Sequence, residues 1–225
     1  GGTVTAEQKS EVAQENPAKL SSDMNALKDN LIQFGTISTS TSTNHLDFGF
    51  PALCLMFDQA GQDMVSENHG YNWLSNQLML QDRVKTSSYN NFIWKLHFQH
   101  IKSANDILKT LVSDEEPQGQ IANYTGQALA SRAFDYLQLV QAYQFTYLGH
   151  EEELAVPIVT ETMSEEEAMN NPLATVKDVY TQIMSDLDTA IPYLENNPVD
   201  GDKAQINAAV AYGLRARANM LMGEY

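Results

Sequence analysis

The sequence predicts an all-α protein built from stacked helical hairpins that are joined by long irregular loops. Three stretches between Gln127 and Tyr225 repeat their apolar residues at steps of three and four, which is the spacing of one helix face. No two segments show the alternation of apolar and polar residues that is typical of paired strands. Stacked helical hairpins serve binding more often than catalysis, so we expect a binding protein.

Each of these stretches predicts one amphipathic helix. The first is expected over 123–147, with its apolar face on Leu129, Ala133, Tyr136, Val140, Tyr143 and Tyr147. The second is expected over 176–194, with its face on Val176, Tyr180, Ile183, Leu187, Ala190 and Leu194, and Pro192 should loosen or end its last turn. The third is expected over 205–222, with mostly small residues on the corresponding positions Ile206, Ala209, Gly213, Ala216, Met220 and Gly223.

The chain closes on Gly223-Glu224-Tyr225, a pattern that is typical of the turn between two helices of one repeat. The small-residue face of the last helix should therefore pack on the preceding helices, leave an apolar patch uncovered, or contact a neighbouring molecule.

Earlier in the chain, helices are expected over 3–32 in two pieces, over 51–60, and over 89–111. The last of these carries its apolar face on Trp94, His97, Ile101, Ala104, Leu108 and Leu111. Residues 35–44 form a Ser/Thr-rich loop, and 149–175 form an acidic, mostly extended connection. The acids at 165–167 indicate a charged helix start within that connection.

Composition narrows the possible partners. The 225 residues fit one large or two small domains, and 29 acidic against 13 basic residues give a formal net charge of −16. Such a surface repels phosphate, which excludes nucleic acid and anionic membrane surfaces as expected partners. Cys54 is the single cysteine, so no intrachain disulfide can form, and its apolar neighbours favour a buried, unreactive thiol.

No motif points to catalysis, a metal or a cofactor, and we expect none of the three. His97 and His100 lie three residues apart without a third ligand at a recognisable spacing, which favours packing over metal binding. The acidic runs lack the spacing of a calcium loop. Asn123-Tyr124-Thr125 fits a glycosylation sequon, which is a weak motif. We interpret Arg132 as a structural ion-pairing residue and Trp94 as a structural residue of its helix.

The segment 61–89 is the strongest candidate for a ligand-facing loop. It is long and irregular, and it places aromatic rings among amide, carboxylate and imidazole groups, a combination that suits the apolar faces and hydroxyl rims of sugars. The candidate contacts are Trp73, Tyr71, Asn68, His69, Asn76 and Asp63. The alternative is that Trp73 and Tyr71 only anchor the loop to the helices.

Five motifs in order give the chain a resemblance to a known family. They are Trp94-Lys95-Leu96 through Ala104-Asn105, Gly126-Gln127-Ala128 through Tyr136, Val156-Pro157-Ile158-Val159-Thr160, Val179-Tyr180 through Ile191, and Ala211 to Tyr225. Together they resemble the SusD/RagB-like proteins, whose patterns include "GEA..LRA..Y", "VPLVT" and "A..L.AR..L..G.Y". The match spans about 94–225, and the region before it is compatible.

The resemblance implies a surface-exposed outer-membrane lipoprotein that captures oligosaccharides or related nutrients and delivers them to a TonB-dependent transporter. It implies that 3–225 is the N-terminal part of one SusD-like domain, with N-terminal helices and the ligand-facing loop in 3–90 and tetratricopeptide-like helices in 91–225. We interpret Gly1-Gly2 as a tag scar or linker, and expect the C-terminal half, the signal peptide and the lipid-bearing cysteine to be absent. The alternatives are a tetratricopeptide-type adaptor that binds only protein, and a glycan hydrolase.

Overall fold

The computed structural model describes residues 21–32, 88–143, 146–199 and 206–224. These residues form six helices: α2 (Ser21–Ile32), α5 (Ser88–Leu111), α6 (Gly119–Tyr143), α7 (Glu165–Met169), α8 (Val176–Asn196) and α9 (Ala208–Met222). The same residues contain no strand beyond one isolated bridge between Leu154 and Thr175, so the all-α class is confirmed. The helices expected over 3–20 and 51–60 lie outside the described residues.

The chain divides into two compact units, one of residues 29–99 and one of residues 1–28 with 100–225. In the first unit, the Trp94 and Phe98 rings lie 4.6 Å apart on one face of α5, and His97 is fully buried. Among the helices of the described residues, none is both long and apolar enough to cross a membrane.

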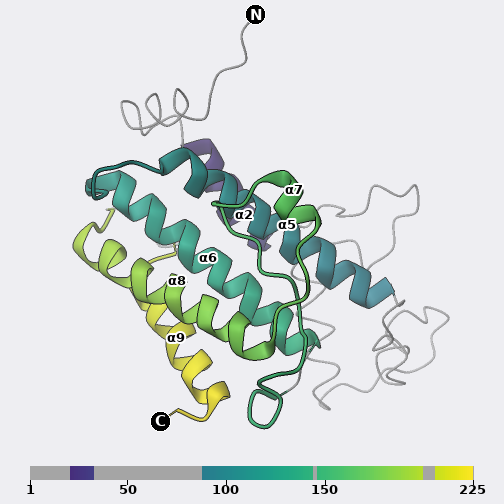
Figure 1. Ribbon diagram of the computed structural model, residues 1–225. Coiled ribbons are helices and arrows are strands. Elements are labelled where there is room, and N and C mark those ends of the chain that lie inside the picture. The colour runs from purple at the N-terminus through teal and green to yellow at the C-terminus, as the bar shows by residue number, and fades with distance from the viewer. Residues whose placement is uncertain (1–20, 33–87, 144–145, 200–205, 225) are drawn as a thin grey trace, which may run out of the picture. The chain divides into compact units, whose positions relative to one another are not determined.

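In the second unit, α6 packs along α8, and α8 packs against α9 (Figure 1). All six positions predicted for the apolar face of α8 are buried, and on α6 the predicted positions Leu129, Ala133, Tyr136 and Val140 are buried. The face predicted for α8 is therefore confirmed, and the face predicted for α6 is confirmed as far as Val140, since Tyr143 is half-buried and Tyr147 lies beyond the helix. Their burial supplies the main stabilising term of this unit.

The bounds of α6 differ from the prediction by four residues at each end, since the helix runs over Gly119–Tyr143 and not 123–147. Its first turn is tied to the end of α8 by Asn197. The backbone N–H of Gly119 donates to Asn197 Oδ1 over 2.8 Å, and Asn123 Nδ2 donates to the Asn197 carbonyl over 2.9 Å. The sequon asparagine Asn123 is thus a buried structural residue.

The prediction that Pro192 ends or loosens α8 is wrong, because the helix continues through it to Asn196. A proline removes one intrahelical N–H donor and clashes with the preceding turn. Here the Pro192 ring is exposed, while Ile191 and Leu194 on either side are buried. Their packing holds the last turn in helical form.

The small-residue face of α9 is uncovered, except at Ile206, which is buried. The buried residues are Ala211 and Ala218, whereas the positions expected on the apolar face are exposed: Ala209, Gly213, Ala216 and Met220. Small residues satisfy the apolar period of either face but bury little area, so they do not determine which face packs. The outcome is the uncovered apolar side that was one of the expected alternatives.

α9 ends in a glycine cap. Gly223 has φ 78° in the left-handed region, and its N–H donates to the Met220 carbonyl over 3.1 Å. This conformation is easy for glycine and strained for other residues, so the position fits the residue that occupies it.

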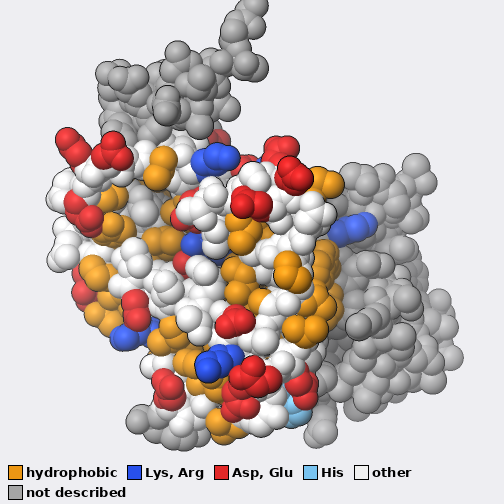
Figure 2. Space-filling model, in the orientation of Figure 1, with side chains coloured by type: hydrophobic (Ala, Val, Ile, Leu, Met, Phe, Trp, Pro, Cys, Tyr) orange, Lys and Arg blue, Asp and Glu red, His pale blue; other side chains and the backbone are white. Residues whose placement is uncertain are grey.

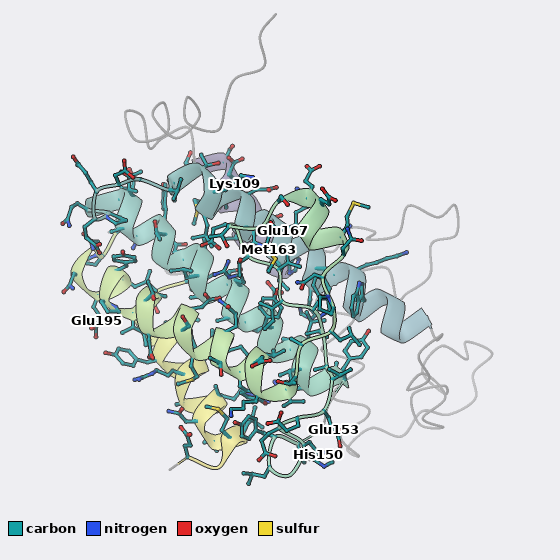
Figure 3. The ribbon with its side chains drawn as sticks, viewed as in Figure 1. Lys109, His150, Glu153, Met163, Glu167 and Glu195 are labelled. Atoms are coloured by element: carbon teal, nitrogen blue, oxygen red, sulfur yellow. The ribbon has the colours of Figure 1, made fainter. Side chains whose placement is uncertain are left out.

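The connection between α6 and α8 is mostly extended, as predicted, and contains the short helix α7. Ser164 and Glu167 cap this helix reciprocally, with Ser164 N–H donating to Glu167 Oε2 over 2.8 Å. These bonds from Ser164 lower the pKa of Glu167. Figure 3 labels Glu167, together with Met163 just before the helix. The charged helix start is therefore confirmed.

Buried tyrosines make this fold sensitive to alkali. Burial raises the pKa of both Tyr143 and Tyr180 to about 12, whereas an unfolded tyrosine ionises near 10. Between these values the unfolded chain releases protons that the folded chain keeps, so the free energy of unfolding should fall as pH rises from about 10 to 12. Thermal melts between about pH 10 and 12 measure how steeply the stability falls with pH. Tyr180→Phe should make this fall less steep, and an unchanged slope would contradict the prediction.

Candidate functional site

Arg132 of α6 is the centre of a buried polar network. Its side chain is only 2% exposed, and its Nε and Nη2 donate to the two carboxylate oxygens of Asp186 on α8, over 2.8 and 2.7 Å. Its Nη1 donates to Asn105 Oδ1 over 2.8 Å and also to Glu161. The single guanidinium thus joins α5, α6, α8 and the connection between the last two.

Burial and ion pairing act on this network in opposite directions. Burial alone would lower the pKa of Arg132, but the hydrogen bonds and charges of Asp186 and Glu161 outweigh burial and raise it. Burial raises the pKa of the Asp186 carboxyl, and the bonds from Arg132 and Gln182 oppose that rise. A bidentate guanidinium satisfies both oxygens of Asp186, so the pair is an ion pair at neutral pH.

An extended segment, residues 155–161, is fixed beside this network; we call it the strap. Tyr136 of α6 holds it at one residue, because its hydroxyl donates to the Val159 carbonyl over 3.1 Å and accepts from the Val159 N–H over 2.7 Å. Asn105 Nδ2 also donates to the Val159 carbonyl, over 3.0 Å. Side chains of two helices therefore fix the strap at Val159, while at its start the backbone of Ala155 and Val156 pairs with Ala174.

Arg132, Glu161 and Asp186 line one side of an open cleft of about 540 Å³. The cleft is lined by the end of α5 and the turn that follows it, by α6 and α8, and by Thr160 and Glu161 of the strap with Thr162 just after it. Its walls include a small apolar group of Leu108, Leu111 and Leu129. They also carry six aliphatic hydroxyls, on Ser113, Thr125, Thr160, Thr162, Ser185 and Thr189.

The mouth of the cleft is acidic. Asp114, Glu115 and Glu116 line it from the turn after α5, and Arg132, the one basic residue in the lining, is already paired. Tyr193 of α8 orients one of these acids, since its hydroxyl donates to Glu116 Oε1 over 2.8 Å. The wider face follows the same trend, with red carboxylate side chains more frequent than blue basic ones in Figure 2.

A second groove, of about 600 Å³, runs between the first half of α8 and the end of α9. Tyr147 and Tyr180 meet edge to face in it, with their ring centroids 5.0 Å apart. An exposed ion pair, Arg215 with Asp188 at 2.8 Å, joins α9 to α8 beside it.

The two histidines of α5 do not lie at this cleft. His100 is 2% exposed, and its Nδ1 lies 3.2 Å from Asp135 Oδ1 of α6. The pair is a buried contact between α5 and α6.

The six ligand contacts predicted from the sequence, Trp73, Tyr71, Asn68, His69, Asn76 and Asp63, all lie outside the described residues. The cleft itself was not predicted. Its residues come from four segments of the chain. Two features of the sequence could have indicated the cleft: Arg132, the one arginine of the α6 motif, and the "VPIVT" connection, which ends at Thr160.

A family model described as "SusD-like_3: Starch-binding associating with outer membrane" matches residues 11–220. The solved structures include a SusD-like carbohydrate-binding protein from Bacteroides vulgatus, with a TM-score of 0.78 and 24% identity over 92% of this chain. They also include a SusD superfamily protein from Bacteroides fragilis, with a TM-score of 0.72 and 22% identity over 92% of this chain. A laminarin-binding SusD-like protein matches with a TM-score of 0.62 and 23% identity over 90% of this chain.

At these identities the structural likeness shows the fold. The chain spans less than half the length of these three structures, at 42%, 46% and 40% of their chains. No curated protein matches the sequence at a significant level.

Proposed function

The chain belongs to the SusD-like family, and on that basis we propose that it contributes to a protein that binds carbohydrate without transforming it. The observation that carries this proposal is the match of residues 11–220 to a family described as starch-binding. It is supported by the name of one structural relative, which binds laminarin, and by a helical scaffold of the kind that serves binding.

The geometry of the described residues supports capture more than catalysis. The two carboxylates deepest in the polar network, Asp186 and Glu161, are held by Arg132, so neither is a free acid or base. The cleft beside them offers hydroxyls, carboxylates and a small apolar wall, which are groups that recognise sugars by hydrogen bonds and packing.

We extend the proposal to what the resemblance implies for the whole protein. Bound oligosaccharide would be handed to a TonB-dependent transporter at the outer membrane, and a lipid anchor would hold the protein at the cell surface. The family description supports the association with the outer membrane. The loop of residues 61–89 remains the candidate main ligand platform, with Trp73 as its central ring.

Trp73→Ala tests this platform. If the Trp73 ring stacks on sugar, the variant should lose most of its retardation in affinity gels that contain a glycan bound by the wild type. By analogy with the stacking of bases on aromatic side chains, one stacked ring contributes about 1–3 kcal/mol to binding. The melting temperature of the variant should stay that of the wild type. Trp94→Phe is the matched control, since it removes the other tryptophan and keeps a ring beside Phe98.

Unchanged retardation of Trp73→Ala would remove Trp73 from the site. A wild-type protein that no glycan gel retards, but that captures a transporter ectodomain, would instead support the adaptor function.

A further inference from the structure

We infer that the cleft beside Arg132 is a sugar subsite that accepts neutral or amino-bearing glycans and rejects acidic ones. The inference rests on the proposed function and adds the charge class of the ligand to it. It is carried by three observations on the described residues: the cleft volume, the polar groups on its walls, and the surplus of carboxylates at its mouth.

The size and rigidity of the cleft suit one or two sugar units. Its volume of about 540 Å³ falls within the roughly 300–1,000 Å³ of small-molecule sites. Its walls are fixed, because Arg132 joins α6 to α8 and Tyr136 holds the strap. A preformed site loses little conformational entropy when a ligand binds.

The polar groups match a polyhydroxylated ligand. Aliphatic hydroxyls and carboxylates accept hydrogen bonds from sugar hydroxyls, and Val112, a lining residue that is 66% exposed, can contact a sugar C–H face. The Tyr193 hydroxyl donates to Glu116, which fixes the carboxylate and leaves its other oxygen available as an acceptor. Tyr193 and Glu116 are therefore the two contacts on which the site depends most.

The charge of the cleft sets the selectivity. Five acidic residues line it, Asp114, Glu115, Glu116, Glu161 and Asp186, and Arg132 is the one basic residue. A uronate or sulfate group would face these carboxylates with no unpaired cation in the lining, and like charges repel at close range. An amino sugar would gain an opposite charge at the same place.

The binding arm of the test uses affinity gels and titration calorimetry with a panel of glucan, chitosan and polygalacturonate oligosaccharides. Tyr193→Ala should weaken the neutral glucan that binds the wild type by about tenfold or more. Tyr212→Ala is the matched control. Tyr212 also donates to a carboxylate over 2.8 Å, that of Glu195 on α8, which is labelled in Figure 3. Neither Tyr212 nor Glu195 lines the cleft.

The charge arm compares Glu116→Gln with Glu195→Gln at low salt. Polygalacturonate should bind the wild type at least about tenfold more weakly than the neutral glucan. Glu116→Gln should reduce this ratio of the two affinities. Glu195→Gln should leave it unchanged. The melting temperature of each variant shows that it is folded.

The possible outcomes separate the two proposals. Normal binding by Tyr193→Ala with lost binding by Trp73→Ala would overturn the subsite and leave the proposed function standing. Polygalacturonate bound as tightly as neutral glucan would overturn the charge selectivity. A wild type that binds no member of the panel would overturn both.

Discussion

Replacement of Arg132 by methionine is expected to lower the free energy of unfolding by about 3–5 kcal/mol, the cost of breaking one side of a buried ion pair. The variant leaves Asp186 buried at 3% exposure with its charge uncompensated, and it removes a contact to Glu161 and Asn105. For a chain of this size each kcal/mol shifts the melting temperature by about 2–4 °C. Calorimetry should therefore show a fall of roughly 10 °C.

The control is a pair on the surface of the same unit. Arg215 and Asp188 also lie 2.8 Å apart, but their side chains are 41% and 53% exposed. Arg215→Met should cost less than about 1 kcal/mol, because solvent screens exposed pairs. The double variant Arg132→Met with Asp186→Leu should recover part of the loss, since it removes the unpaired carboxylate. Equal losses for Arg132→Met and Arg215→Met would contradict the central role of Arg132.

Two glycines should respond to alanine in opposite directions. A Cβ added at Gly126 of α6 would lie 2.8 Å from Leu194 Cγ and 3.1 Å from the Ala190 carbonyl oxygen. The carbonyl belongs to the backbone of α8 and cannot rotate away, so the two helices must move apart. Gly126→Ala should therefore lower the free energy of unfolding by about 1–3 kcal/mol, because the cost of this steric clash exceeds the gain in helix propensity.

At Gly213 of α9 the same Cβ would meet nothing within 4 Å. Gly213→Ala should raise the free energy of unfolding by about 0.5–1 kcal/mol, the usual cost of glycine inside an exposed helix. Chemical denaturation of both variants measures the difference. A stabilised Gly126→Ala would show that α6 and α8 do not approach closely at this residue.

The helices of this unit differ in how well the sequence predicts their packing. The helices α6 and α8 carry large residues at helical spacing, and large apolar side chains bury enough area to decide which face packs. In α9 five of the eleven apolar residues are alanine, which buries little area, so the periodicity left open which face of this helix packs. Local pattern also misjudged Pro192, because the buried Ile191 and Leu194 beside it are tertiary packing.

The site was predictable to a smaller extent. We expected Arg132 to form a structural ion pair, but the sequence does not identify its partners. Asp186, Glu161 and Asn105 lie 27 to 54 residues away from it in the sequence. A single sequence contains no information on which of its 29 acids meets the arginine. The cleft has the same origin: it exists only once the turn after α5, the strap and α8 are brought together.

The strap has a consequence for how this unit opens. Val159 has both of its backbone hydrogen-bonding groups engaged by the hydroxyl of Tyr136, a residue with no exposed surface. A connecting segment of this kind cannot detach by local fluctuation alone, because its release exposes a core ring and frees two polar groups at once. The strap should therefore unfold together with α6 as one cooperative unit, although it has no regular secondary structure of its own.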